Sequence, residues 1–372
     1  MTEPRVFLDG KVTLFPGDCL VMLKEIPDGS VDAVVTDPPA GIAFMGREWD
    51  KDKGGRNDWI AWMSDVAAQC LRVIKPGGHA LVWALPRTSH WTATAWEDAG
   101  WDVRDRVIHI FGSGFPKSMD ISKQLDKAAG AEGGYGAKKP NVHSRGDHVL
   151  NEGWRRPWMD DAAAVDKSGR EYLPSTEAAR QWQGWGTALK PAAEDWWLLR
   201  KPLIGTVAQN VLTHGVGGLN VNGCRVEGII DSGWSKTGSK ASENVAMSGR
   251  NYAREPKPDA TMGRYPANVT HDGSDEVLAG FPETGISTLG VRHPNGSMGY
   301  HGGASGLPGV VSGYVDSGSA ARFFYCAKGS SDDRVGSKHP TVKNLDLMQW
   351  LIRLVTPRGG TVLDCFAGSG TT

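Results

Sequence analysis

Residues 31–111 alternate between strand-like and helix-like patterns, and this alternation constrains the fold more than any other feature of the chain. A short β-branched run at 31–36 is followed by an apolar stripe at helical spacing over 58–74. Strand-like runs recur at 79–85 and 103–111, with a helical stretch at 91–99 between them. A β-α-β-α-β order of this kind predicts an α/β fold with a parallel, doubly wound sheet.

The regular pattern stops after the third strand and returns only in the last part of the chain. Residues 112–193 and 205–318 are rich in glycine and polar residues, and a strand-like run at 194–204 separates them. Long segments of this kind are usually functional loops or small extra domains. Beyond them we expect a strand at 320–327 and an amphipathic helix at 344–355. These boundaries divide the chain into 1–111, 112–193, 194–204, 205–318 and 319–372.

Composition narrows the class of protein. Of the 372 residues, 40% are hydrophobic and 22% charged, which predicts a folded core rather than disorder. There is no signal-like or membrane-length apolar run, and the five cysteines form no Cys-x-x-Cys pair. We therefore expect a cytoplasmic protein without membrane segments, metal ions or disulfides. The net charge of −1 does not exclude nucleic acid, because positive charge can be confined to one cleft.

Asp37, Pro38 and Pro39 follow the first predicted strand and suit the chemistry of an amino group. The exocyclic amine of adenine or cytosine is a weak nucleophile, because its lone pair is delocalised into the ring. A carboxylate and a backbone carbonyl that accept both N–H bonds would favour a pyramidal nitrogen with an available lone pair. Asp37 offers the carboxylate, and the fixed φ of proline holds the Pro38 carbonyl. The alternative is an ordinary capped turn after a strand.

A second motif, residues 364–372 (DCFAGSGTT), ends a predicted strand at 361–366. Gly368 and Gly370 allow the backbone to approach a ligand closely. Loops of this type serve nucleotides, dinucleotides and S-adenosylmethionine (SAM) alike. The motif lacks the Gly-Lys-Ser/Thr ending of a phosphate loop and does not match the dinucleotide fingerprint. Its ligand can therefore be inferred only together with the first motif.

Together the two motifs resemble the permuted N4-cytosine/N6-adenine DNA methyltransferases of bacteria and phages, in which the catalytic half precedes the SAM loop. The resemblance covers both ends of the chain in the same order, and the long middle only in patches such as 264–268 (RYPAN). The matching segments are 17–20 (GDCL), 35–42 (VTDPPAGI), 75–78 (KPGG), 114–117 (GFPK), 188–191 (ALKP), 324–328 (FYCAK) and 338–343 (KHPTVK).

The resemblance implies an α/β, Rossmann-like SAM-dependent methyltransferase fold that is circularly permuted and carries large loop-rich insertions. Each predicted segment then has an expected role. These are a catalytic half (1–111), an insertion (112–193), a return strand (194–204), a target-recognition-like insertion (205–318) and a SAM-binding half (319–372).

The resemblance also implies roles for single residues. Asp37, Pro38 and Pro39 would hold the target amine. The implied partner is double-stranded DNA in a bacterial or phage-infected cell, within a restriction-modification system. No motif indicates the oligomeric state, and a homodimer is one option. The cofactor would be SAM, and the residues implied in its binding are Asp18, His339, Pro340, Thr341, Lys343, Asp364, Phe366, Gly368, Gly370 and Thr371.

The expected reaction is direct methyl transfer from SAM to the exocyclic amine of a base flipped out of the duplex. Aspartate before the proline pair favours N6 of adenine, with N4 of cytosine as the alternative. C5-cytosine methylation is rejected, because it needs a thiolate, commonly in a Pro-Cys setting, and no cysteine here follows a proline. RNA and protein-glutamine methyltransferases usually lack such insertions. A non-catalytic DNA-binding protein that retains the fold remains an alternative from another class.

Two departures from the family pattern lead to further expectations. The family usually has an aromatic residue after the two prolines, which stacks on the flipped base, and this chain has Ala40. We expect Phe44 or Trp49 to cover the base instead, the alternative for each being core packing. Family members also continue past the glycine loop to an acidic residue that binds the SAM ribose. The SAM-binding half is therefore expected to be truncated, as a fragment, a natural truncation, or a chain completed by another.

Overall fold

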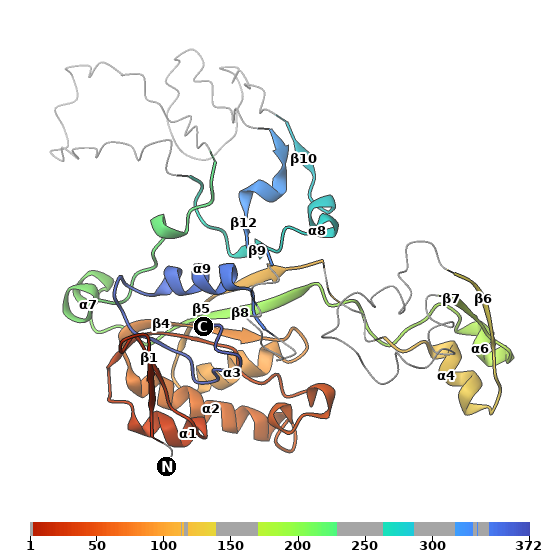
Figure 1. Cartoon of the computed structure of the whole chain (residues 1–372), viewed down its shortest axis with the longest axis horizontal. Coiled ribbons are helices and arrows are strands. Elements are labelled where there is room, and N and C mark those ends of the chain that lie inside the picture. Colours follow the sequence, from red (N-terminus) through yellow and green to blue (C-terminus); the bar gives the residue numbers. More distant parts are fainter. Residues whose placement is uncertain are drawn as a thin grey trace, which may run out of the picture. The chain divides into compact units, whose positions relative to one another are not determined.

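Two compact units make up the chain in the computed structural model, one formed by Met1–Gly112 with Ala193–Thr372 and one by Ser113–Ala192 (Figure 1). The residues that the structure describes are 3–112, 114, 118–138, 170–228, 263–285, 317–329, 333 and 342–372. Within these residues, no helix has the length and apolar character needed to cross a membrane. The same residues form no group of His, Cys, Asp and Glu side chains that could hold a metal ion.

A seven-stranded sheet forms the centre of the first unit. Every neighbouring pair in it is parallel, except that one strand, β8, is antiparallel to both of its neighbours. In spatial order the strands are β12 (Tyr325–Cys326), β9 (Val269–His271), β5 (Asp102–Ile110), β8 (Ala193–Arg200), β4 (Ile74–Ala84), β3 (Val31–Thr36) and β13 (Val362–Leu363).

Strand β8 makes the sheet mixed, whereas the sequence pattern predicted a purely parallel one. The predicted α/β class is confirmed. However, β4 and β5 are not neighbours, because β8 returns between them after the first insertion. Its apolar residues Trp196, Leu198 and Leu199 are buried, as a central strand requires. The strand expected over 194–204 ends at Arg200, shortly before Pro202, which has no N–H to donate to a ladder.

Two other predicted strands are shorter than their apolar runs. The run at 320–327 begins as a 3-10 helix, η7 (Ala320–Phe323), where the Ser319 hydroxyl accepts a hydrogen bond from the Ala321 N–H. Only the two residues of β12 within it are strand. The run at 361–366 is strand only in β13, because the Asp364 carboxylate accepts the Phe366 N–H at 3.0 Å and turns the backbone away from the sheet.

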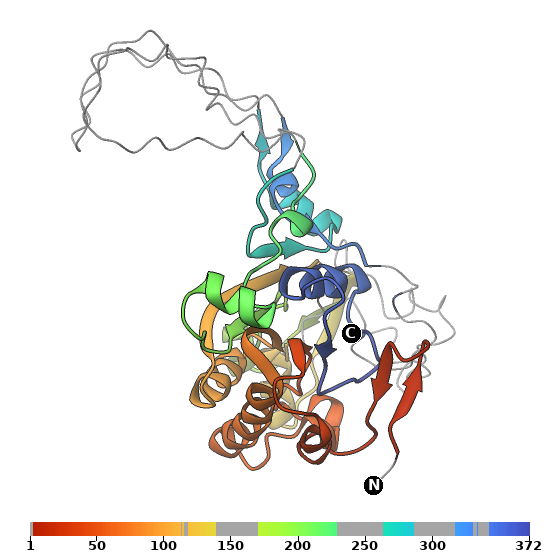
Figure 2. The ribbon, with the colours of Figure 1, turned by 90° about the vertical axis from the view of Figure 1, so that its left-hand side faces the viewer.

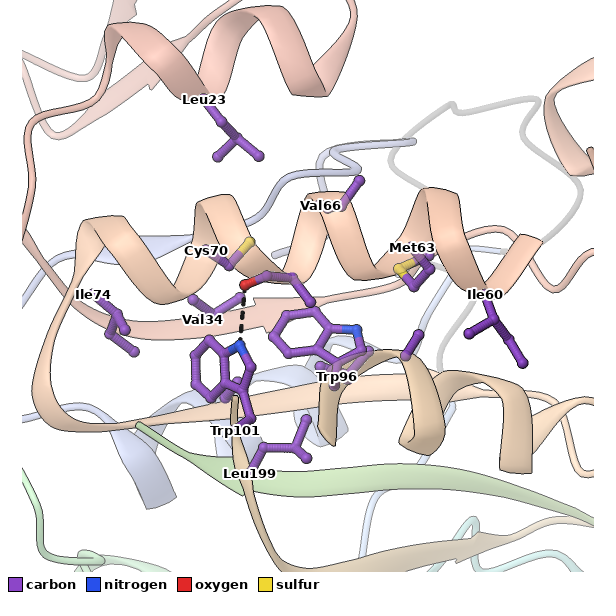
Figure 3. Packing of buried hydrophobic residues seen from close by; sticks show 14 of the residues in the cluster. Leu23, Val34, Ile60, Met63, Val66, Cys70, Ile74, Trp96, Trp101 and Leu199 are labelled. Carbon is purple, nitrogen blue, oxygen red and sulfur yellow. Dashed lines mark hydrogen bonds between the residues drawn. The ribbon is translucent and has the colours of Figure 1, made fainter. Parts of the chain in front are cut away.

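Helices cover both faces of the sheet, as the predicted layers require. Helices α2 (Arg56–Val73) and α3 (Ser89–Asp98) pack against one face, and α9 (Leu345–Val355) packs against the other (Figure 1). Strand β3 contributes Val34 to the first core, and Ala33 and Val35 to the second. The Trp101 indole donates to the Ala67 carbonyl at 3.0 Å (Figure 3), which connects the residue just before β5 to α2. The predicted apolar stripe of the first helix is confirmed by five fully buried side chains, those of Trp59, Met63, Val66, Ala67 and Cys70.

Short elements complete the first unit. A two-stranded hairpin near the N-terminus joins β1 (Arg5–Phe7) and β2 (Val12–Leu14), shown in red in Figure 2. In the described part of this unit, the other helices are α1 (Cys19–Met22), α7 (Val207–His214) and α8 (Asp275–Ala279), with the 3-10 helices η1 (Leu23–Glu25), η2 (Phe44–Gly46), η3 (Glu48–Asp50) and η5 (Asn222–Cys224). A further strand pair joins β10 (Glu283–Thr284) and β11 (Gly318–Ser319).

The second unit is organised around one buried carboxylate. Its described elements are α4 (Ile121–Ala128), α6 (Glu177–Gln181) and a hairpin of β6 (Gly134–Lys138) and β7 (Arg170–Leu173). Asp126 on α4 is fully buried and accepts hydrogen bonds from the Tyr172 hydroxyl, the Ser175 N–H, and both the N–H and hydroxyl of Thr176. These bonds join α4 to the hairpin and to the start of α6.

Candidate active site

The two sequence motifs meet at one edge of the sheet. Strands β3 and β13 are parallel neighbours, so the residues that follow them emerge at the same edge. The hydroxyl of Thr36, at the end of β3, donates to the Asp364 carboxylate at 2.7 Å, directly after β13. Asp37 and the glycine loop are therefore joined through one hydrogen bond between residues 328 positions apart. Ligands of open α/β sheets bind outside the carboxyl ends of their strands, which is where both motifs lie.

Asp37 lies beside a buried lysine. The Lys343 ammonium is 2.9 Å from the Asp37 carboxylate, and the two side chains are 11% and 24% exposed. Among the described residues, no other side chain forms a hydrogen bond or ion pair with this carboxylate. The structure thus brings two predicted site residues into contact. The resemblance had implied a different role for Lys343, namely contact with SAM.

Electrostatics at Asp37 combine burial with three nearby charges. Burial raises the pKa of the Asp37 carboxyl, the Lys343 ammonium opposes that rise, and the Glu194 and Asp364 carboxylates add to it. Burial alone would lower the pKa of Lys343, but Asp37 and Glu194 together raise it above its ordinary value. Lys343 is therefore a cation at neutral pH.

Two residues that the sequence did not single out complete the surroundings of Lys343. The ammonium lies 4.0 Å from the Glu194 carboxylate and 4.0 Å from the centre of the Trp83 ring. The Trp83 indole N–H in turn donates to the same Glu194 carboxylate at 2.8 Å. Both residues occur in apolar strand-like runs, and no local signal in the sequence indicates that they face Asp37.

The loop after the proline pair is held by a third overlooked residue, Asp50. This carboxylate is 1% exposed and accepts the N–H groups of Ala40 at 2.6 Å, Gly41 at 3.1 Å and Phe44 at 2.7 Å. The Thr88 hydroxyl donates to the Ala40 carbonyl at 2.8 Å. Asp50 sits in a charged stretch, where an aspartate is usually solvated, so its burial could not be predicted.

Position 41 in this loop requires a glycine, because no side chain fits there. Its φ is +70°, and an added Cβ would lie 2.7 Å from the Trp59 indole nitrogen. The two aromatic residues expected to cover the target base follow this turn. Phe44 lies in η2 and is half-buried, and Trp49 lies in η3 and is 44% exposed.

The residues expected around SAM lie in the glycine loop, at the start of α1 and in a segment outside the described residues. Gly368 and Gly370 have φ of +53° and +76°, and space beside Gly370 is open where a Cβ would stand. The Phe366 ring packs 5.8 Å from Trp62, and the Thr371 hydroxyl hydrogen-bonds Ser369. The exposed Asp18 carboxylate caps α1 by accepting the Leu20 N–H. His339, Pro340 and Thr341 lie outside the described residues.

The sheet and this site are typical of α/β proteins whose ligand site lies at the carboxyl edge of parallel strands. Within that class, the chain belongs to the DNA methylase family of N6 and N4 enzymes, which matches residues 31–124 and 188–372.

Individual relatives match over shorter stretches. The type II methyltransferase M.BamHI of Bacillus amyloliquefaciens is 34% identical over 86 residues, which are 23% of this chain and 20% of that protein. The DNA adenine methyltransferase YhdJ of Escherichia coli is 39% identical over 80 residues, 20% of this chain and 26% of YhdJ. The chain thus spans about a fifth to a quarter of these curated relatives. The solved PvuII DNA methyltransferase (cytosine-N4-specific) aligns over 96% of this chain and 74% of its own, with 13% identity and a TM-score of 0.39.

Proposed function

We propose that this chain transfers a methyl group from SAM to the exocyclic amine of a base in double-stranded DNA, with N6 of adenine favoured over N4 of cytosine. The observation that carries the proposal is the Thr36–Asp364 hydrogen bond, which fastens the Asp37 motif to the glycine loop at one sheet edge. Membership of the DNA methylase family supports the reaction class and covers both kinds of target amine.

The chain's own residues supply the acceptors for the amine. The Asp37 carboxylate accepts one N–H bond of the target amine, and the Pro38 carbonyl, fixed by the proline φ, accepts the other. Lys343 contacts Oδ2 of Asp37 and so leaves Oδ1 for the amine. Because the amine of a stacked base is out of reach of these acceptors, the target base flips out of the duplex before transfer.

SAM supplies an electrophilic methyl group when bound. The open side of the glycine loop fits a cofactor that approaches the backbone closely, because Gly368 and Gly370 have no side chain and their positive φ values favour glycine at both positions. Asp364, Phe366 and Thr371 would hold SAM at this loop, with Asp18 at the exposed start of α1 as a further ligand.

We also propose that the chain has the permuted order of the family, with DNA contacts made from within the insertions 112–193 and 205–318, the second of which also supplies β9 to the central sheet. The catalytic strand β3 precedes β13 by most of the chain, yet the two are neighbours in the sheet.

The direct test of the proposed function is incubation with labelled SAM and mixed-sequence DNA, followed by nucleoside analysis. Labelled N6-methyladenine would support the proposal, and labelled N4-methylcytosine would show that cytosine is the target instead. Absence of label from all nucleosides, under conditions where SAM binds, would refute the proposal.

Replacing both Phe44 and Trp49 by alanine is expected to weaken binding of target DNA about tenfold or more, because a base stacked on an aromatic ring contributes roughly 1–3 kcal/mol. The measurement is the Kd for duplex carrying the target, compared with each single variant and with melting temperatures. Unchanged affinity and activity in the double variant would show that neither ring covers the base.

A further inference from the structure

Lys343 lies between two carboxylates and above an indole ring. Its ammonium is 2.9 Å from Asp37 and 4.0 Å from Glu194, and it lies 4.0 Å from the centre of the Trp83 ring. The Trp83 N–H donates to Glu194, so the ring and the carboxylate that surround the ammonium also hold each other. A buried cation over an aromatic face and beside two carboxylates is confined on three sides.

The antiparallel strand β8 explains why Glu194 is at this place. The strands β3, β4 and β13 end at the site edge, whereas β8 runs the other way and begins there. Thr36 pairs with Val82, which places Asp37 level with Trp83, and Trp83 pairs with Trp196. Glu194, near the start of β8, thereby lies at the carboxyl end of the parallel strands.

The charges in this group do not cancel. Asp37 and Glu194 share a single ammonium, and the Asp364 carboxylate adds a further negative charge next to Asp37. A carboxylate buried among other carboxylates tends to take up a proton, and a protonated Asp37 would donate a hydrogen bond where the target amine needs an acceptor. The ionised state of Asp37 therefore depends on Lys343.

We propose that Lys343 keeps the Asp37 carboxylate ionised and oriented for the target amine, and that Glu194 and Trp83 are positioning residues that hold Lys343 against it. The inference deepens the proposed function and rests on it for its consequence in methylation. The state of the Asp37 carboxyl in the free protein is a separate observable.

Two substitutions are expected to move the ionisation of Asp37 in opposite directions. Lys343→Met removes the one cation that contacts Asp37 among the described residues, so the pKa of the Asp37 carboxyl should rise. Glu194→Gln keeps an acceptor for the Trp83 N–H but removes a negative charge, so the pKa of Asp37 should fall. The other titratable groups that act electrostatically on this site are Asp364, which influences Asp37, and His109 on β5, which is influenced by Glu194, Asp272 and Lys343. Burial lowers the pKa of His109 below its ordinary value, so its imidazole is uncharged at neutral pH.

In methylation assays, the acidic limb of the pH–rate profile should shift to higher pH in Lys343→Met and to lower pH in Glu194→Gln. Glu194→Gln should also lower kcat about tenfold with a smaller effect on KM for DNA, because the carboxylate of Asp37 is less well oriented. Lys343→Arg should restore the limb toward its native position. Asp195→Asn is the matched control, because Asp195, the neighbour of Glu194 on β8, is paired with Arg106 instead. This substitution should leave the acidic limb of the pH–rate profile in place.

The decisive measurement does not need DNA or SAM. Carbon-13 labelling of aspartate carboxyls, with Asp37→Asn to assign the signal, gives the pKa of Asp37 in each folded variant. Opposite shifts in Lys343→Met and Glu194→Gln support the proposal, and shifts of the same sign, or none, overturn it whatever the enzyme does. If Lys343→Met fails to fold, Lys343→Gln serves in its place. Correct shifts in a protein that methylates no DNA would instead reject the proposed function.

Discussion

Replacing Asp37 by alanine is expected to reduce methyl transfer to DNA by about 10²–10³-fold, the loss typical of removing one preorganised polar group that contacts the reacting atoms. Asp37 is the carboxylate at the meeting point of the two motifs, and its position is set by β3 on one side and Lys343 on the other. Without it, the amine retains only the backbone acceptor. The measurement is single-turnover incorporation of label from SAM into a saturating DNA substrate.

Three comparisons isolate the chemical effect of this change. Asp37→Asn keeps the size and one acceptor oxygen, so it should lose less activity than Asp37→Ala. Removing Asp37 leaves Lys343 with Glu194 as a counterion, so the variant should fold, and SAM binding should persist. Asp28→Ala removes a surface carboxylate that is 78% exposed and should leave the rate unchanged. Label incorporation at the native rate in Asp37→Ala would remove Asp37 from the reaction.

The sequence predicts best those elements whose buried face is marked by a regular spacing of apolar residues within the element itself. The stripe from Trp59 to Cys70 follows from helical spacing, and the strand β3 follows from its β-branched run. Strand order does not, because β8 is inserted between β4 and β5 by pairing with both, and neither partner is close to it in sequence. Local turns also escaped prediction, as the side chains of Ser319 and Asp364 compete with the strand ladder for backbone N–H groups.

The same distinction holds for the site. Asp37 and Asp364 could be predicted, since each follows a strand in a short motif with recognisable chemistry. Glu194, Trp83 and Asp50 could not, because their roles arise from neighbours that only the fold brings close. Trp83 illustrates the point, as an apolar run at 79–85 predicts a core residue, and only the register with β3 and β8 places it next to Lys343.

Asp50→Ala is expected to have the largest effect on stability among the site residues. The substitution leaves the N–H groups of Ala40, Gly41 and Phe44, which are buried or partly buried at this hydrogen-bonded centre of the turn, without their acceptor. An unsatisfied buried donor costs about 1–3 kcal/mol, and the three losses overlap, so we expect a destabilisation of about 3 kcal/mol. The measurement is the free energy of unfolding, with hydrogen exchange of these three amides as the local readout.

Activity should fall as well, by up to about 10²-fold, because the loop that Asp50 holds begins directly after Pro39 and a displacement of about 1 Å is enough for that loss. Asp50→Asn tests the mechanism further, since its amide N–H₂ group must face at least one of the donor N–H groups. It should lie between the native chain and Asp50→Ala. The matched control is Asp52→Ala, an exposed acid in the same segment. Faster exchange at Ala40, Gly41 and Phe44 with native turnover would mean that the loop is not part of the reacting site. Slow exchange in Asp50→Ala would mean that other contacts, such as the Thr88 hydrogen bond to Ala40, are sufficient to hold it.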